Sequence, residues 1–86
     1  MEQTIDVSML EPCEPLERIL AALQQLVVGD YLRVIHRREP HPLYQLLQKG
    51  GFSWQTVECE PGRYEIFIWK QDDHMAEKMV LQKTGH

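Results

Sequence analysis

Apolar and polar residues alternate along the first segment of the chain, residues 4–10. Ile5, Val7 and Met9 are apolar, and the residues between them are polar. A period of two places the apolar side chains on one face of an extended strand. The pattern therefore predicts a short β-strand over residues 4–10, which ends at the proline-containing segment "EPCEP".

After Pro15 the spacing of the apolar residues becomes that of a helix. They lie three or four positions apart, at Leu16, Ile19, Leu20, Leu23, Leu26 and Val27. Proline suits a first helical turn because the backbone N–H group that it lacks would have no helical partner there. Glu14 and Glu17 favour the positive end of the helix dipole. These features predict a helix over about residues 14–26, with Gly29 as its C-terminal stop.

The remaining pattern predicts one more helix and three more strands. Residues 30–38 are rich in β-branched and aromatic side chains, which is typical of a strand, and "EPHP" ends it. Residues 42–51 begin with a proline, carry leucines at helical spacing and end in two glycines, which predicts a short helix. Residues 52–60 and 63–70 predict an antiparallel hairpin around the turn "PG".

The predicted order of elements is β-α-β-α-β-β. Two strand-to-strand connections through helices favour right-handed crossovers and helices on one side of the sheet. We therefore expect an α/β protein, an α+β two-layer sandwich with a four-stranded mixed sheet and two helices on one face. We expect both parallel strands in the interior of the sheet.

The last predicted strand carries large aromatic residues, Phe67 and Trp69, on the face that the two helices leave open. The domain is expected to span residues 1–71, followed by a tail over residues 72–86 that is either a short helix or disordered. A tail helix lying across the aromatic face would cover it, and a homodimer contact is the competing explanation. A few exposed aromatic side chains beside a frayed tail would fit the sequence equally well.

Composition limits the classes of function. A chain of 86 residues, 43% hydrophobic and 26% charged, is typical of one small globular domain. The net charge of −4 counts against general nucleic-acid binding, which needs a basic face. The chain has no basic segment before an apolar run and no long apolar run, so we expect a cytoplasmic protein without a membrane span.

Cys13 lies between two prolines, after the first strand and just before the first helix. A helix N-terminus stabilises a thiolate, so a cysteine at this position can be reactive. The neighbouring Glu14 opposes thiolate formation, and a lone cysteine is more often a small buried apolar residue. Cys59 lies in a strand pattern and is interpreted as structural.

The second predicted strand ends in "HRREPH", which contributes His36, Arg37, Arg38 and His41. The carboxyl ends of parallel strands meet at one edge of a sheet, where ligands bind to open α/β sheets. We therefore expect this cationic segment to stand near Cys13, as a ligand-binding edge that also includes Glu14. A solvated strand end is the simpler interpretation. No metal site and no cofactor is predicted, because two histidines around a turn are a weak ligand set.

The succession of a strand, "EPCEPLERIL", a helix, a strand, "HPLYQLL" and a terminal hairpin resembles the TusA-like (SirA-like) superfamily of small sulfur carriers over residues 4–70. Members of that family carry a Cys-Pro-x-Pro motif whose cysteine holds a persulfide. Here Pro15 matches the second proline of the motif and Glu14 its variable position. Cys13 stands at the first proline and Pro12 at the cysteine, so the thiol is displaced by one residue.

The segments "EPLERIL" and "PHPLYQLL" are most similar to an uncharacterised sister group, a TusA-like domain of unknown function that is found with hemerythrin-like domains. This resemblance implies a shared fold and a shared ligand edge, but no established activity. A metal or haem role for His36 and His41 would follow from the hemerythrin association alone.

Three functional hypotheses follow. The first is a binding or carrier module that holds a small anionic ligand or a protein partner with helix N–H groups, Arg37 and Arg38. The second is a sulfur carrier in which Cys13 relays persulfide. The third is a protein-interaction or dimerisation module that uses the aromatic sheet face. Independent catalysis is not expected, because the chain lacks a Ser/His/Asp constellation and metal-ligand spacing.

Overall fold

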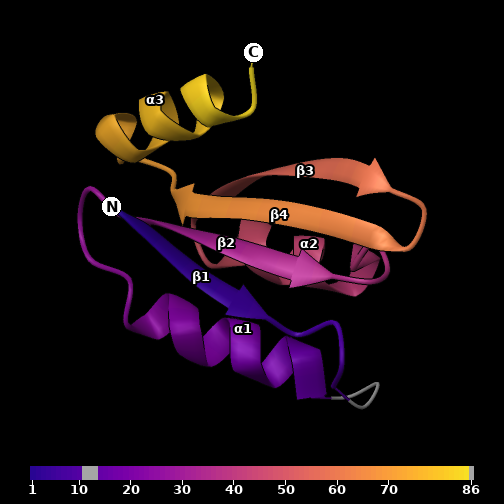
Figure 1. Ribbon diagram of the computed structural model, residues 1–86. Coiled ribbons are helices and arrows are strands. Elements are labelled where there is room, and N and C mark those ends of the chain that lie inside the picture. The colour runs from indigo at the N-terminus through magenta and orange to yellow at the C-terminus, as the bar shows by residue number, and fades with distance from the viewer. Residues whose placement is uncertain (11–13, 86) are drawn as a thin grey trace.

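A computed structural model describes residues 1–10 and 14–85 (Figure 1). The elements in chain order are β1 (Glu2–Asp6), α1 (Glu14–Gln24), β2 (Tyr31–His36), α2 (His41–Lys49), β3 (Phe52–Glu60), β4 (Arg63–Lys70) and α3 (His74–Lys83). The predicted α+β class, the β-α-β-α-β-β order and the terminal hairpin are confirmed. A third helix follows the six predicted elements.

The four strands form one mixed sheet in the order β1-β2-β4-β3. β1 and β2 are parallel, and β4 runs antiparallel to both β2 and β3. The prediction that both parallel strands lie in the interior was wrong for β1, which is an edge strand. The crossover through α1 places β2 beside β1, and the hairpin then inserts β4 on the far side of β2, so no strand reaches the outer side of β1.

β1 begins and ends earlier than its alternating pattern predicts. The carboxylate of Asp6 accepts hydrogen bonds from the backbone N–H of Ser8 (2.9 Å) and from its hydroxyl (2.6 Å). Such a local side-chain bond turns the backbone away from the strand. Val7 is still buried, but the side chain of Met9 is 88% exposed. The prediction of a strand reaching residue 10 was therefore wrong.

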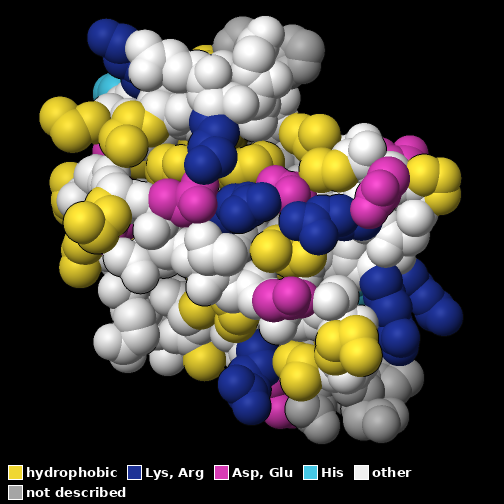
Figure 2. All heavy atoms as spheres, viewed as in Figure 1, with side chains coloured by type: hydrophobic (Ala, Val, Ile, Leu, Met, Phe, Trp, Pro, Cys, Tyr) yellow, Lys and Arg dark blue, Asp and Glu magenta, His cyan; other side chains and the backbone are white. Residues whose placement is uncertain are grey.

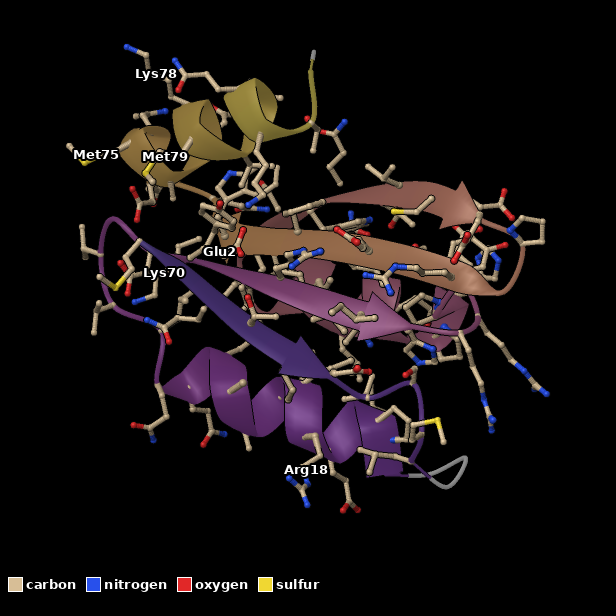
Figure 3. The ribbon with its side chains drawn as sticks, in the orientation of Figure 1. Glu2, Arg18, Lys70, Met75, Lys78 and Met79 are labelled. Carbon is tan, nitrogen blue, oxygen red and sulfur yellow. The ribbon has the colours of Figure 1, made fainter. Side chains whose placement is uncertain are left out.

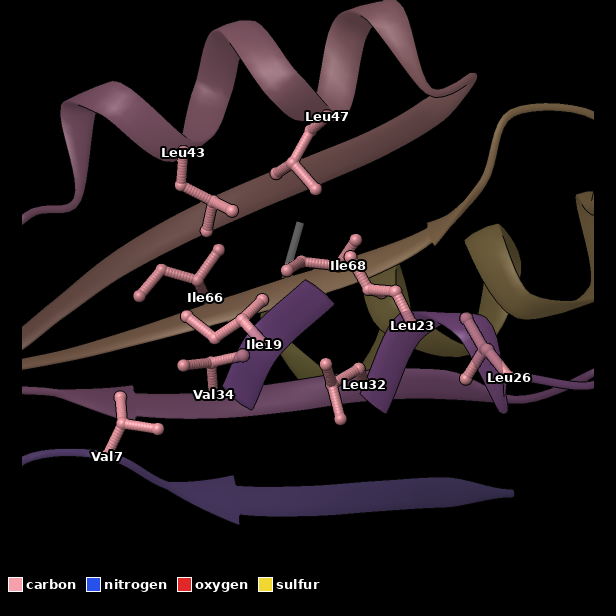
Figure 4. Packing of buried hydrophobic residues seen from close by; sticks show 10 residues of the cluster. All are labelled: Val7, Ile19, Leu23, Leu26, Leu32, Val34, Leu43, Leu47, Ile66 and Ile68. Carbon is pink, nitrogen blue, oxygen red and sulfur yellow. The ribbon is translucent and has the colours of Figure 1, made fainter. Parts of the chain in front are cut away.

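The helices α1 and α2 cover one face of the sheet and enclose the main core (Figures 1 and 4). The core is built from Val7, Ile19, Leu23, Leu26, Leu32, Val34, Leu43, Leu47, Ile66 and Ile68. Full burial of each such side chain is worth about 1.5–3 kcal/mol. Apolar packing from both helices and from the two central strands therefore holds the helices against the sheet.

α3 lies on the opposite face and adds a third helix to the two on one face that the sequence predicts (Figure 1). Ala76 and Val80 of α3 are fully buried against Tyr31, Phe67 and Trp69. The aromatic side chains of the sheet are thus covered by the chain's own helix. They do not form the exposed docking surface of the third hypothesis.

The start of α3 is tied to the loop before β2. Asp73 caps the helix by accepting the N–H of Ala76 (3.1 Å), and it also accepts the N–H of Gly29 (2.6 Å). Gly29 has a φ of +92°, a conformation that favours glycine. The helix α1 ends at Gln24, so Gly29 shapes the turn into β2 and is not the predicted helix stop.

In the part of the chain that the structure describes, no helix has the length and apolar character needed to cross a membrane.

Candidate functional site

The largest hollow near the end of β2 lies between the first turns of α1 and α2 and has a volume of about 530 Å³. Its walls are formed by Pro15, Leu16, Glu17, Ile19, His36, Arg38, Glu39, Pro40, Pro42 and Leu43. Small-molecule sites commonly fall in the range of about 300–1,000 Å³ and are mostly apolar with a few polar groups. Six of these ten residues are proline, leucine or isoleucine, so the hollow fits that description.

A second, smaller hollow of about 110 Å³ adjoins the first. It is lined by Val7, Leu10, Pro15, His36, Arg37 and Arg38. Pro15, His36 and Arg38 belong to both hollows. Among the described residues that line the smaller hollow, none is acidic, whereas Glu17 and Glu39 line the larger one. The described linings of the two hollows therefore differ in charge, although the hollows share a wall.

His36 stands at the boundary between the hollows and is partly buried. Its Nδ1 accepts a hydrogen bond from the backbone N–H of Arg38 at 3.1 Å. A neutral imidazole that accepts at Nδ1 carries its proton on Nε2, so the ring has a donor available there. Burial lowers the pKa of His36 below its usual 6.5, and the charges of Arg37 and Arg38 lower it further.

Arg37 and Arg38 are exposed, and neither makes an ion pair with a carboxylate among residues 1–10 and 14–85. Lys and Arg side chains gather in Figure 2 beside the end of β2. The neighbouring Glu39 is engaged elsewhere, since it accepts the hydroxyl of Tyr44 at 3.0 Å and lies 3.5 Å from Nε2 of His41. Among the described residues, no carboxylate therefore occupies the two guanidinium groups.

His41 stands apart from this group. Its side chain is 74% exposed, lines neither hollow and meets Tyr44 edge-on at 5.8 Å between ring centroids. Cys13 lies outside the described residues, and so does the side chain of Glu14. The structure thus places His36, Arg37 and Arg38 beside the start of α1, and it leaves His41 outside.

Sequence reasoning missed the apolar walls of the site. Leu16 and Ile19 were assigned to a helix core, and Pro40 and Pro42 were interpreted as punctuation, although all four line the larger hollow. A signal was available, because "EPCEPL" and "EPHPL" both bring a proline followed by a leucine to the start of a helix at the same sheet edge.

The first turn of α2 is held in place by an aromatic stack. The rings of Tyr44 and Trp54 lie nearly parallel, 5.2 Å apart and inclined by 8°, and the Tyr44 hydroxyl also bonds to Thr56. The N–H groups of His41 and Leu43 donate to nearby carbonyl oxygens. At α2, anion recognition would therefore rest on side chains and not on free backbone N–H groups.

The described residues contain no group of three or more His, Cys, Asp or Glu side chains that could hold a metal ion. Cys59 lies in β3 and is exposed, at the same end of the sheet as His36 but two strands away, next to Glu58, which pairs with Tyr64. Burial and the neighbouring Glu65 raise the pKa of its thiol. The environment of Cys59 therefore disfavours the reactive thiolate form.

The chain matches the model of a known family. The model of the uncharacterized conserved protein family DUF2249 matches residues 4–70, which include both hollows and the whole sheet except the start of β1. Comparisons with curated proteins and with solved structures found no match.

Proposed function

Because the chain belongs to the DUF2249 family, whose members are described only as uncharacterized conserved proteins, we propose its function from the geometry of the site. The protein is a non-catalytic binding module. It holds a small anionic ligand at the edge where β2 ends and where α1 and α2 begin. An acidic protein partner, the other ligand expected from the sequence, would have to present a carboxylate at this same edge.

The observation that carries this proposal is the pair of arginines at a ready-made hollow. Arg37 and Arg38 have no carboxylate partner among the described residues, and His36 offers a ring donor between them and the apolar wall. Charged groups left without a partner beside a concave apolar site favour an anion there.

Backbone amide chemical shifts can test the proposal. We expect phosphate, acetate or octanoate, added in turn to the labelled protein, to shift the signals of Leu16, His36 and Leu43 while leaving α3 unchanged. The double variant Arg37→Ala/Arg38→Ala should lose the response. Arg18→Ala is the matched control, since Arg18 projects from the outer side of α1 into solvent (Figure 3). Failure of all three probes, or shifts confined to α3, would overturn the proposal.

A persulfide relay through Cys13 is the second candidate. Pro15, two residues after Cys13, lines both hollows beside His36 and Arg38. A thiolate formed near these cationic groups would be stabilised. The resemblance to TusA-like sulfur carriers supports this candidate, and the one-residue displacement of the cysteine weakens it. The labelling experiment in the Discussion tests it independently of ligand binding.

A further inference from the structure

The two adjoining hollows have different chemistry and share His36 and Arg38 as a boundary. The smaller one is cationic and apolar, with Arg37 at its rim and no acidic residue among the described residues that line it. The larger one is lined mainly by prolines and aliphatic side chains from two helices. One ligand lying across the boundary would meet a cationic end and an apolar end.

The geometry points to an amphipathic carboxylate, an acid group on an unbranched aliphatic chain, as the ligand class of this site. This inference rests on the proposed function and adds the identity and orientation of the ligand. The carboxylate lies in the smaller hollow and the aliphatic chain in the larger one.

The polar groups at the boundary suit a carboxylate. A guanidinium offers parallel N–H donors that match the two oxygens of a carboxylate. His36 adds a third donor, because acceptance of the Arg38 N–H at Nδ1 leaves the ring proton on Nε2. A cationic ligand would meet two arginines and would be repelled.

The position of the acidic side chains sets the orientation. Glu17 and Glu39 belong to the larger hollow, so an anionic group placed there would lie near like charges. An aliphatic chain carries no charge and gains from contact with Leu16, Ile19 and Leu43 in the same hollow. Each methylene that becomes fully buried raises affinity by up to about fourfold.

Isothermal titration with four probes tests the inference. Octanoate, acetate, octan-1-ol and octylamine are titrated into the full chain, each below the concentration at which it aggregates. We expect octanoate to bind at least tenfold more tightly than each of the other three. Arg38→Ala should lower the affinity for octanoate at least tenfold, and Arg18→Ala should leave this affinity unchanged.

A second variant tests the contact with the apolar end of the ligand separately from the contact with its carboxylate. Leu16 is only partly buried, so Leu16→Ala should remain folded. This variant should lower the affinity for octanoate severalfold without changing the affinity for acetate, because it removes only apolar contact. Circular dichroism of each variant checks that the fold is retained.

The outcomes distinguish this inference from the proposed function. If acetate binds as tightly as octanoate, the site is a simple anion site, and the inference fails while the proposed function stands. If octan-1-ol or octylamine matches octanoate, the charge has no role and the inference fails. If no probe binds, both fail.

Discussion

Arg33 on β2 donates two parallel hydrogen bonds to Glu65 on β4, from Nε to Oε1 and from Nη2 to Oε2, each 2.8 Å long. This pair lies on the sheet face opposite α1 and α2, beside the aromatic residues that α3 covers. Arg63 adds a contact of 3.2 Å to Glu65, and Glu2 lies 3.9 Å from Arg33. Alternating charges therefore bridge three strands on the part of this face next to α3.

The hydrogen bonds from the Arg33 guanidinium lower the pKa of the Glu65 carboxyl to about 2, well below its usual 4.5. A carboxyl whose pKa is lower in the folded than in the unfolded state adds stability above pH 4.5. That stability is lost as the pH falls from 4.5 toward 2. The shift sets an upper limit of roughly 3 kcal/mol on the contribution at pH 7. We expect Glu65→Gln to unfold at lower urea concentration at pH 7 and to lose less stability between pH 7 and pH 3.

Glu60→Gln is the matched control, because Glu60 is exposed at the end of β3. It should change the free energy of unfolding by less than about 0.5 kcal/mol. Equal acid sensitivity of the wild type and Glu65→Gln would show that the Arg33–Glu65 pair does not set the acid limit of stability.

The packing of α3 on the aromatic face of the sheet leads to a second prediction. Val80 is fully buried against the aromatic side chains of the sheet, so Val80→Ala leaves a cavity there. We expect a loss of about 2 kcal/mol in the free energy of unfolding, measured with urea. Leu81→Ala, at the neighbouring and exposed position, should cost less than about 0.5 kcal/mol. Equal effects of the two variants would contradict the packing of α3 on the sheet.

Periodicity predicted the helices and the hairpin because apolar spacing directly reports burial. It could not predict the end of β1, where the alternation of apolar residues continues to Met9 but the carboxylate of Asp6 binds Ser8 and turns the chain. It also could not place α3. Ala76 and Val80 are buried, but Met75 on the same helix is 68% exposed, so the apolar pattern of this short helix is weak.

The cationic half of the site was predictable and the apolar half was not. His36, Arg37 and Arg38 form a contiguous segment at a strand end, which sequence shows directly. Pro15 and Pro42 come from separate helices, and their meeting depends on how α1 and α2 pack side by side on the sheet. His41 was grouped with the arginines by proximity in sequence, but its contacts with Glu39 and Tyr44 hold it outside both hollows.

The two cysteines should differ in reactivity. Burial and Glu65 raise the pKa of the Cys59 thiol, so iodoacetamide should label Cys59 more slowly at pH 7 than a free thiol. If Cys13 relays persulfide, its labelling should stay fast well below pH 8.5, the usual thiol pKa. Mass spectrometry after labelling at several pH values measures each site separately. A Cys13 that follows the profile of a free thiol would remove the relay and leave anion binding untouched.

The position of His36 predicts a pH dependence of ligand binding. Burial and the adjacent Arg37 and Arg38 lower its pKa, so the unliganded protein holds His36 neutral near pH 7. A bound carboxylate places a negative charge beside the ring and raises the pKa of His36 in the complex. Binding therefore takes up a proton, and affinity rises as the pH falls through the pKa of the complex. It levels off below the lower pKa of the unliganded protein.

We expect the affinity for octanoate to rise severalfold between pH 8 and pH 5.5, a range in which a carboxylate with an ordinary pKa of about 4 stays ionised. His36→Gln keeps an N–H donor near the position of Nε2 but cannot be protonated, so it should bind octanoate with an affinity that does not change over this range. Titration calorimetry in buffers of different ionisation enthalpy counts the protons taken up. An unchanged pH slope in His36→Gln would assign the proton to another group and leave His36 without a role in the pH dependence of binding.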